Sequence, residues 1–119
     1  MNYETAKKLK EAGFPKKHFY IGDKTTPYLQ YTRPTIYELI SACGDEFVGV
    51  RNFKAELIRT HGKEKGLKYF NGGYDTTKEW IADSTRQTES DEGTIGWISE
   101  GGSTPEEAVA ALWLALNNH

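Results

Sequence analysis

The sequence predicts an α+β domain in which a small antiparallel sheet of three to four strands packs with about three helices. Apolar residues recur with helical spacing near both ends of the chain and in its first half. Strand-like segments are gathered between those helices, and their connections are too short for parallel crossovers. The 119 residues contain no internal repeat and no interdomain linker, so we expect one domain over residues 1–119.

The composition is that of a soluble, folded chain. Hydrophobic residues make up 37%, charged residues 27% and aromatic residues 13% of the sequence, and disordered chains contain fewer aromatics. The N-terminus lacks the apolar segment of a secretory signal. The longest apolar run has nine residues, whereas a membrane span needs roughly 20. We therefore expect a cytoplasmic protein without a membrane contact.

Charge and chemistry narrow the function classes. The net charge of −2 provides no overall basic field, so we do not expect nucleic acid as the partner, although local basic patches stay open. Cys43 is the only cysteine, which excludes an intramolecular disulfide and a cysteine-based zinc cluster. His18, His61 and His119 are scattered, and no phosphate-binding, dinucleotide-binding or hydrolase motif occurs. We expect no catalytic residue, no metal and no cofactor, and hence a protein that is not an enzyme.

The first predicted helix covers residues 2–12. Asn2 is a suitable N-cap, and Gly13 provides a left-handed stop. Tyr3, Ala6 and Leu9 form only a thin apolar stripe. We expect this helix to make a light contact with the core.

An aromatic segment follows, over residues 18–32, and a turn-like stretch interrupts it. It fits a short hairpin or an ordered loop. Phe19, Tyr20, Tyr28 and Tyr31 are candidates for a recognition surface, because tyrosine contributes a large contact area with few rotamers. The same residues would serve equally well as the edge of a small core.

The second predicted helix begins at Thr35, which forms a capping box with Glu38, and ends at Gly44. Its apolar residues share one face, namely Ile36, Leu39, Ile40 and Cys43. We therefore interpret the cysteine as a small core residue and not as a nucleophile.

Four segments are predicted as strands, at residues 46–58, 67–74, 78–84 and 94–100. Alternation in the first strand puts Phe47 and Arg51 on one side, and Val48 and Val50 on the other. The residues between the first two strands are interpreted as a turn, and the polar residues 85–93 as a mobile loop.

Two details refine the predicted sheet. Asn71-Gly72 is the strongest short hairpin signal in the chain. Trp80 and Trp97 are central in the last two strands, so they would be near neighbours on one face if those strands pair.

A basic and aromatic stretch carries most of the candidate binding residues, which are Lys63, Lys65, Lys68, Tyr69 and Tyr74. The functional interpretation is a contact with phosphate or with a single strand, supported by stacking. The structural alternative is a charged turn that leads into a strand with core aromatics.

The last predicted helix begins at Thr104, with proline and two glutamates in its first turn. Its core face contains Val109, Leu112, Trp113 and Leu116. The remaining arc of Ala110, Ala111 and Leu114 is apolar as well. This arc is either an exposed surface of high helix propensity or a contact with a second layer, which would be another helix of the chain or a second copy.

Three segments carry a resemblance: NYETAKKLKEAGFP, RPTIYELISACGDEF and GSTPEEAVAALWLALN. They resemble a group of small proteins of tailed phages, prophages and gut bacteria that share N-Y-x-x-A-K-x-L-K-x-A-G-F-P, P-T-x-x-E-L-I-x-A-C-G and G-x-T-P-E-E-A-V-A-x-L-W-L-A-L. The match covers roughly a third of the chain. The group has no assigned activity, so it implies no catalytic residues. This chain departs from the pattern by a longer segment between about residues 57 and 93.

The resemblance implies a phage- or prophage-type accessory protein, located in the host cytoplasm if it is phage-encoded. We expect it to bind a macromolecular partner, preferably a protein, and to inhibit, for example, a host defence component. Residues 57–74 and 19–31 are the expected binding segments. The alternative is a homo-oligomer that sequesters a nucleotide-like ligand between subunits through the three lysines and the neighbouring aromatics.

Overall fold

The computed structural model describes residues 1–16, 19, 33–89 and 92–117. The helices are α1 (Tyr3–Glu11), α2 (Ile36–Cys43), α3 (Phe53–His61), α4 (Lys63–Gly73) and α5 (Pro105–Asn117). The strands are β1 (Phe47–Asn52), β2 (Trp80–Glu89) and β3 (Ile95–Gly102), and they form one antiparallel sheet in the order β1-β2-β3. The predicted α+β class is confirmed, with more helix than expected.

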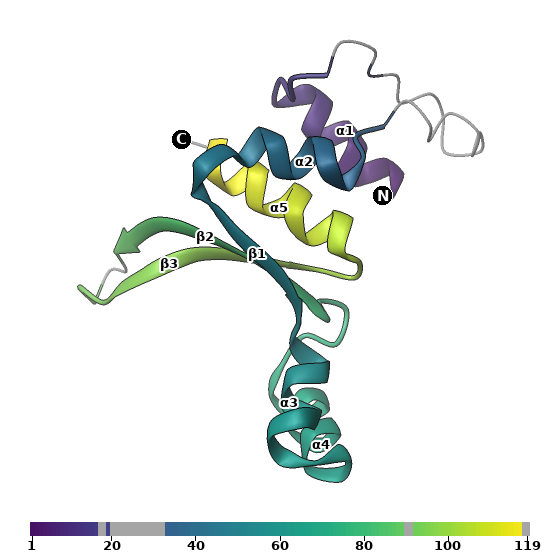
Figure 1. Ribbon diagram of the computed structural model, residues 1–119, viewed down its shortest axis with the longest axis vertical. Coiled ribbons are helices and arrows are strands. Elements are labelled where there is room, and N and C mark those ends of the chain that lie inside the picture. The colour runs from purple at the N-terminus through teal and green to yellow at the C-terminus, as the bar shows by residue number, and fades with distance from the viewer. Residues whose placement is uncertain (17–18, 20–32, 90–91, 118–119) are drawn as a thin grey trace.

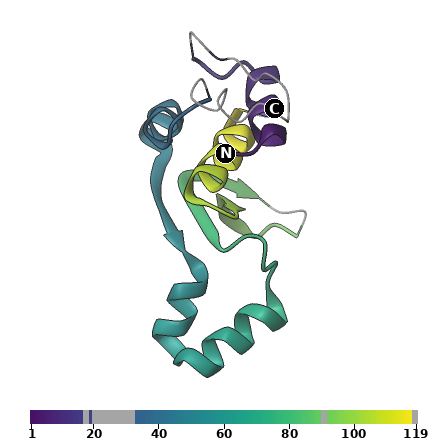
Figure 2. The same cartoon turned by 90° about the vertical axis from the view of Figure 1, so that its right-hand side faces the viewer.

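Helix α5 lies between the sheet and the layer that α1 and α2 form (Figures 1 and 2). Helices α3 and α4 extend to the other side of the sheet and pack mainly against each other. We call this pair, residues 53–73, the arm. None of the helices in the described part of the chain has the length and apolar composition that a membrane span requires.

The core surrounds α5. Leu9, Leu39, Val109 and Leu112 are completely buried, and the ring of Trp113 meets Phe14 edge to face at 5.0 Å between centroids. Truncating one such leucine to alanine typically costs about 2–5 kcal/mol. Ala110 is also completely buried. At Ala110, the second layer on the back of α5 is thus formed by helices of the same chain.

Helix α1 is tied to α5 more firmly than its thin stripe suggests. Asn2 caps α1 as predicted, with its side chain accepting from the backbone N–H of Thr5 at 2.8 Å. Glu107, in the first turn of α5, accepts from the backbone N–H of Asn2 at 2.6 Å and from the hydroxyl of Thr5. Ala6 and Leu9 are fully buried. Helix α1 is therefore an integral part of the core, whereas the sequence predicted only a light contact with it.

The alternation predicted for β1 is wrong. Phe47 and Val50 both pack against the core, because the pairing of β1 with β2 is irregular between Phe47 and Gly49. This irregularity shifts the strand by one residue and leaves Val48 61% exposed on the opposite face. The opposite face thereby gains an apolar side chain.

The strands predicted over residues 53–58 and 67–74, and the turn between them, are helical instead. Asn52 caps α3 by accepting from the backbone N–H of Ala55, and Gly62, at φ +87°, separates the two helices. Asn71-Gly72 lies within α4 and forms no hairpin turn. Helix-favouring residues together with the Asn52 cap outweigh the β preference of the aromatics.

The predicted tryptophan pair is also wrong. Trp80 lies opposite Gly102 and packs against the core, whereas Trp97 lies opposite Gln87 and is 59% exposed. The two rings are on opposite faces of the sheet. Residues 85–89 belong to β2 and not to a loop, and Arg86 forms an ion pair with Glu46.

The close crossing of α3 and α4 generates a prediction. A Cβ atom at Gly66 would lie 2.5 Å from the Cα atom of Ile58, whereas one at Gly72 would meet nothing within 4 Å. Gly66→Ala should loosen the arm, because overpacking of about 1–3 kcal/mol exceeds the roughly 1 kcal/mol gained in helix propensity. Hydrogen exchange should speed up across the arm and stay unchanged in α5.

Gly72→Ala is the matched control, because it adds the same methyl group to the same helix without a clash. It should leave exchange in the arm unchanged or slower. Equal exchange in the two variants would contradict the close crossing at Gly66.

Candidate functional site

The three predicted lysines are all exposed on α4, but they do not form one cluster. Lys65 and Lys68 are three residues apart and share the outer face of the helix. Lys63 is the first residue of α4 and points along another face, because 3.6 residues make a turn. No ion pair within the described residues joins any of the three to a carboxylate.

A shallow depression of about 560 Å³ lies on the arm and includes three of the predicted residues. It is lined by Leu57, His61, Lys68, Tyr69, Gly72, Gly73 and Tyr74. Tyr69 meets His61 edge to face at 4.9 Å, and Tyr74 meets Phe53 at 4.7 Å, while about half of each tyrosine remains exposed. Only the helical arrangement brings His61 next to these tyrosines, so sequence reasoning missed it.

Most of the predicted tyrosine-rich segment lies outside the part of the chain that the structure describes. Tyr20, Tyr28 and Tyr31 lie outside the described residues. Phe19 is described, and its ring meets Phe14 edge to face at 6.2 Å at the margin of the core. For Phe19 the structure supports the core alternative.

The open sheet face, defined here by Val48, Ile95 and Trp97, is the largest departure from the predicted sites. These three side chains are 61%, 66% and 59% exposed. Trp97 and Ile95 alternate with Ile98, which packs against the core, so they lie on the side of the sheet opposite α5, and Val48 lines a depression together with Trp97. A depression of about 340 Å³ beside them is lined by Val48, Asp83, Ser84, Thr85, Trp97 and Ser99. Sequence reasoning missed this face, because apolar residues in strands are ordinarily assigned to the core.

A polar network borders the open sheet face. The Asp83 carboxylate accepts from Arg51 Nε at 2.9 Å and from the Ser99 hydroxyl at 2.8 Å. Arg51 also donates to Glu56 of α3 at 2.6 Å, and its hydrogen bonds to Asp83 and Glu56 raise its pKa. Arg51 is shared between two carboxylates, so the network keeps an excess of one negative charge, and it joins the sheet to the arm.

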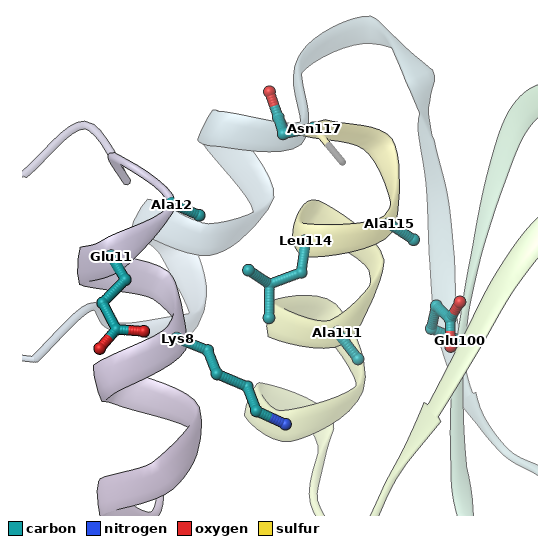
Figure 3. Close-up of a pocket in the computed structure, with 8 residues that line it drawn as sticks. All are labelled: Lys8, Glu11, Ala12, Glu100, Ala111, Leu114, Ala115 and Asn117. Atoms are coloured by element: carbon teal, nitrogen blue, oxygen red, sulfur yellow. The ribbon is translucent and has the colours of Figure 1, made fainter. Parts of the chain in front are cut away.

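A groove of about 690 Å³ lies between α1, α5 and β3 (Figure 3). Leu114 points from α5 toward α1, and Ala111 lies on the side of α5 that faces Glu100 of β3. Of the three residues expected to contact a second copy, Ala110 is buried and inaccessible. Only Ala111 and Leu114 of these three line the groove and remain candidates for that contact. A contact with a second copy stays a prediction.

The described residues include no group of three histidine, cysteine or acidic side chains close enough to hold a metal ion. Cys43 is only 6% exposed, which confirms its place in the core. Burial, and secondarily the charge of Glu46, raises the pKa of its thiol to about 11.

The raised pKa predicts how the thiol reacts. At about pH 8, alkylation of Cys43 should be at least about a hundredfold slower in the folded protein than in the denatured protein, because the thiolate is scarce and shielded. The stability contributed by the neutral thiol should be present below the ordinary thiol pKa and be lost as the pH rises through about 11. Iodoacetamide labelling followed by mass spectrometry measures the rates, and equal rates would contradict the burial.

No family model, no curated protein and no solved structure matches this chain. The resemblance to phage and prophage proteins therefore stays a prediction.

Proposed function

We propose that this protein acts by binding a protein partner through its open sheet face. The observation that carries the proposal is the exposure of Trp97 together with Val48 and Ile95 on one side of the sheet. Exposed apolar groups that cluster in this way are typical of interaction sites. Tryptophan is among the residues that contribute most to binding energy when a partner covers them.

The surroundings of Trp97 fit a protein partner. Protein interfaces combine an apolar centre with a polar rim that supplies hydrogen bonds. Here the rim is formed by Ser99, Thr85 and the ion pair of Asp83 and Arg51. Because Arg51 is shared between Asp83 and Glu56, this rim keeps about one excess negative charge, so the surface does not favour a strongly acidic partner.

The setting of this binding is proposed from the sequence alone. The resemblance of three segments to phage and prophage proteins supports an accessory role in the host cytoplasm, with inhibition of a host defence component as one form of it. The nucleotide-sequestering oligomer is less favoured, because Lys63 lies on a different face of α4 from Lys65 and Lys68 and the three do not converge on one ligand.

Substituting Trp97 tests the proposal. Affinity capture from a bacterial lysate, quantified by mass spectrometry, should recover a protein with the wild type that Trp97→Ser loses by at least about tenfold, as expected for a binding hot spot. Tyr37→Ser is the matched control, because Tyr37 is an aromatic residue 80% exposed on α2, away from the open sheet face. It should retain the captured protein.

This comparison requires that Trp97→Ser is folded as stably as the wild type. Because Trp97 is largely exposed, its substitution should change the free energy of unfolding by less than about 1 kcal/mol, which chemical denaturation measures. Two results would contradict the proposal: Trp97→Ser captures the same proteins as the wild type, or the wild type and Tyr37→Ser share no captured protein. A captured candidate is then purified and titrated directly into the wild type and into Trp97→Ser, and the difference in tryptophan fluorescence between the two isolates the signal of Trp97 from that of Trp80 and Trp113.

A further inference from the structure

The arm is basic although the chain as a whole is acidic. Residues 53–73 contain five lysines and arginines and two glutamates, whereas the rest of the chain contains ten basic and fifteen acidic residues. Glu56 is paired with Arg51, and Lys54 lies 3.8 Å from Glu79. The remaining basic residues of the arm are Arg59, Lys63, Lys65 and Lys68, and none of them forms an ion pair within the described residues. The arm therefore has a local excess of positive charge, although the net charge of the whole chain is −2.

The arm presents this charge away from the acidic body. In both views α3 and α4 extend beyond the sheet, on the side opposite α1, α2 and α5 (Figures 1 and 2). Charges more than about 8–10 Å apart are largely screened at physiological ionic strength. An anionic ligand at the arm would thus experience the lysines of α4 more strongly than the carboxylates of the body.

Aromatic rings lie beside these lysines. Tyr69 lies one helical turn from Lys65, and Lys68 lies three residues from Lys65, so both flank Lys65 on the surface of α4. Tyr69 and Tyr74 each pack against another ring with the two ring planes nearly perpendicular, and both remain about half exposed at the depression. A ring that a neighbour holds in place while about half of it stays open provides a stacking platform of low entropy cost.

We propose that the arm binds single-stranded nucleic acid, with Lys65 and Lys68 contacting successive phosphates and Tyr69 stacking on an unpaired base. Basic residues that follow the backbone beside aromatic platforms are the general means of binding single strands. A duplex hides the base faces that Tyr69 would contact. A free nucleotide in the depression would leave Lys65 unused, because Lys65 is not among its lining residues. This site is separate from the open sheet face.

The test measures binding of a fluorescently labelled oligo(dT) of about 16 nucleotides by anisotropy, at several salt concentrations. The wild type should bind, and the logarithm of its affinity should fall against the logarithm of the salt concentration with a slope of about −0.7 for each phosphate neutralised. Lys65→Glu/Lys68→Glu should lower the affinity by at least about tenfold at low salt and flatten this slope by about 1.4.

The chain offers a matched control. Lys7 and Lys10 are exposed on α1 with the same spacing, so Lys7→Glu/Lys10→Glu changes the net charge by the same amount away from the arm. This variant should bind within about twofold of the wild type. Trp97→Ser should bind as the wild type does. An equal loss in both lysine variants, or no binding by the wild type, would overturn the proposal.

Further measurements separate stacking from charge. Tyr69→Phe should retain binding and Tyr69→Ala should lose about tenfold, because stacking requires the ring and not the hydroxyl. Three results would overturn the assignment to single strands. They are equal affinity for a duplex of the same length, full displacement by thymidine monophosphate at concentrations comparable to the oligonucleotide, and equally tight binding of poly-glutamate. The first of these would remove the stacking role, the second would indicate a free nucleotide, and the third an acidic protein.

Discussion

The burial of α5 on all sides but one is the constraint on which the rest of the structure depends. Its apolar run cannot be exposed without a large penalty, so the sheet must cover one side and α1 and α2 the other. Glu107 holds the N-terminus of α1 to the first turn of α5, and Arg86 donates to the carbonyl of Leu116 in the last turn. The two ends of α5 are therefore fixed by elements that lie far apart in the sequence.

Placing every core helix on one side of the sheet leaves the other side without a layer. A sheet that is covered on one side usually carries polar residues on its free side. Here Val48, Ile95 and Trp97 depart from that rule, whereas Asp83, Arg51 and Ser99 follow it. Exposed apolar side chains lower the solubility of a protein. A binding partner that covers this surface therefore explains their presence better than chance exposure does.

Sequence reasoning succeeded where the signals are local. The caps at Asn2 and Thr35 and the burial of Cys43 follow from the side chain and its immediate neighbours, and all three are confirmed. It failed where a long-range contact decides the outcome. The crossing at Gly66 stabilises two helices whose aromatic residues favour strands, and the irregular pairing near Phe47 turns Val48 outward. The open sheet face could not be foreseen, because exposure depends on which side of the sheet α5 occupies.

The arm enters and leaves the sheet at a single point. Asn52 pairs with Trp80, and the backbone N–H of Phe53 donates to the carbonyl of Glu79 at 2.8 Å, so the chain returns to the place from which it departed. The strand pair is closed there whatever the intervening segment contains. The segment is enclosed between two paired strands, so its length and its surface can change without altering the packing around α5. The binding surface of the arm and the stability of the body are therefore largely independent of each other.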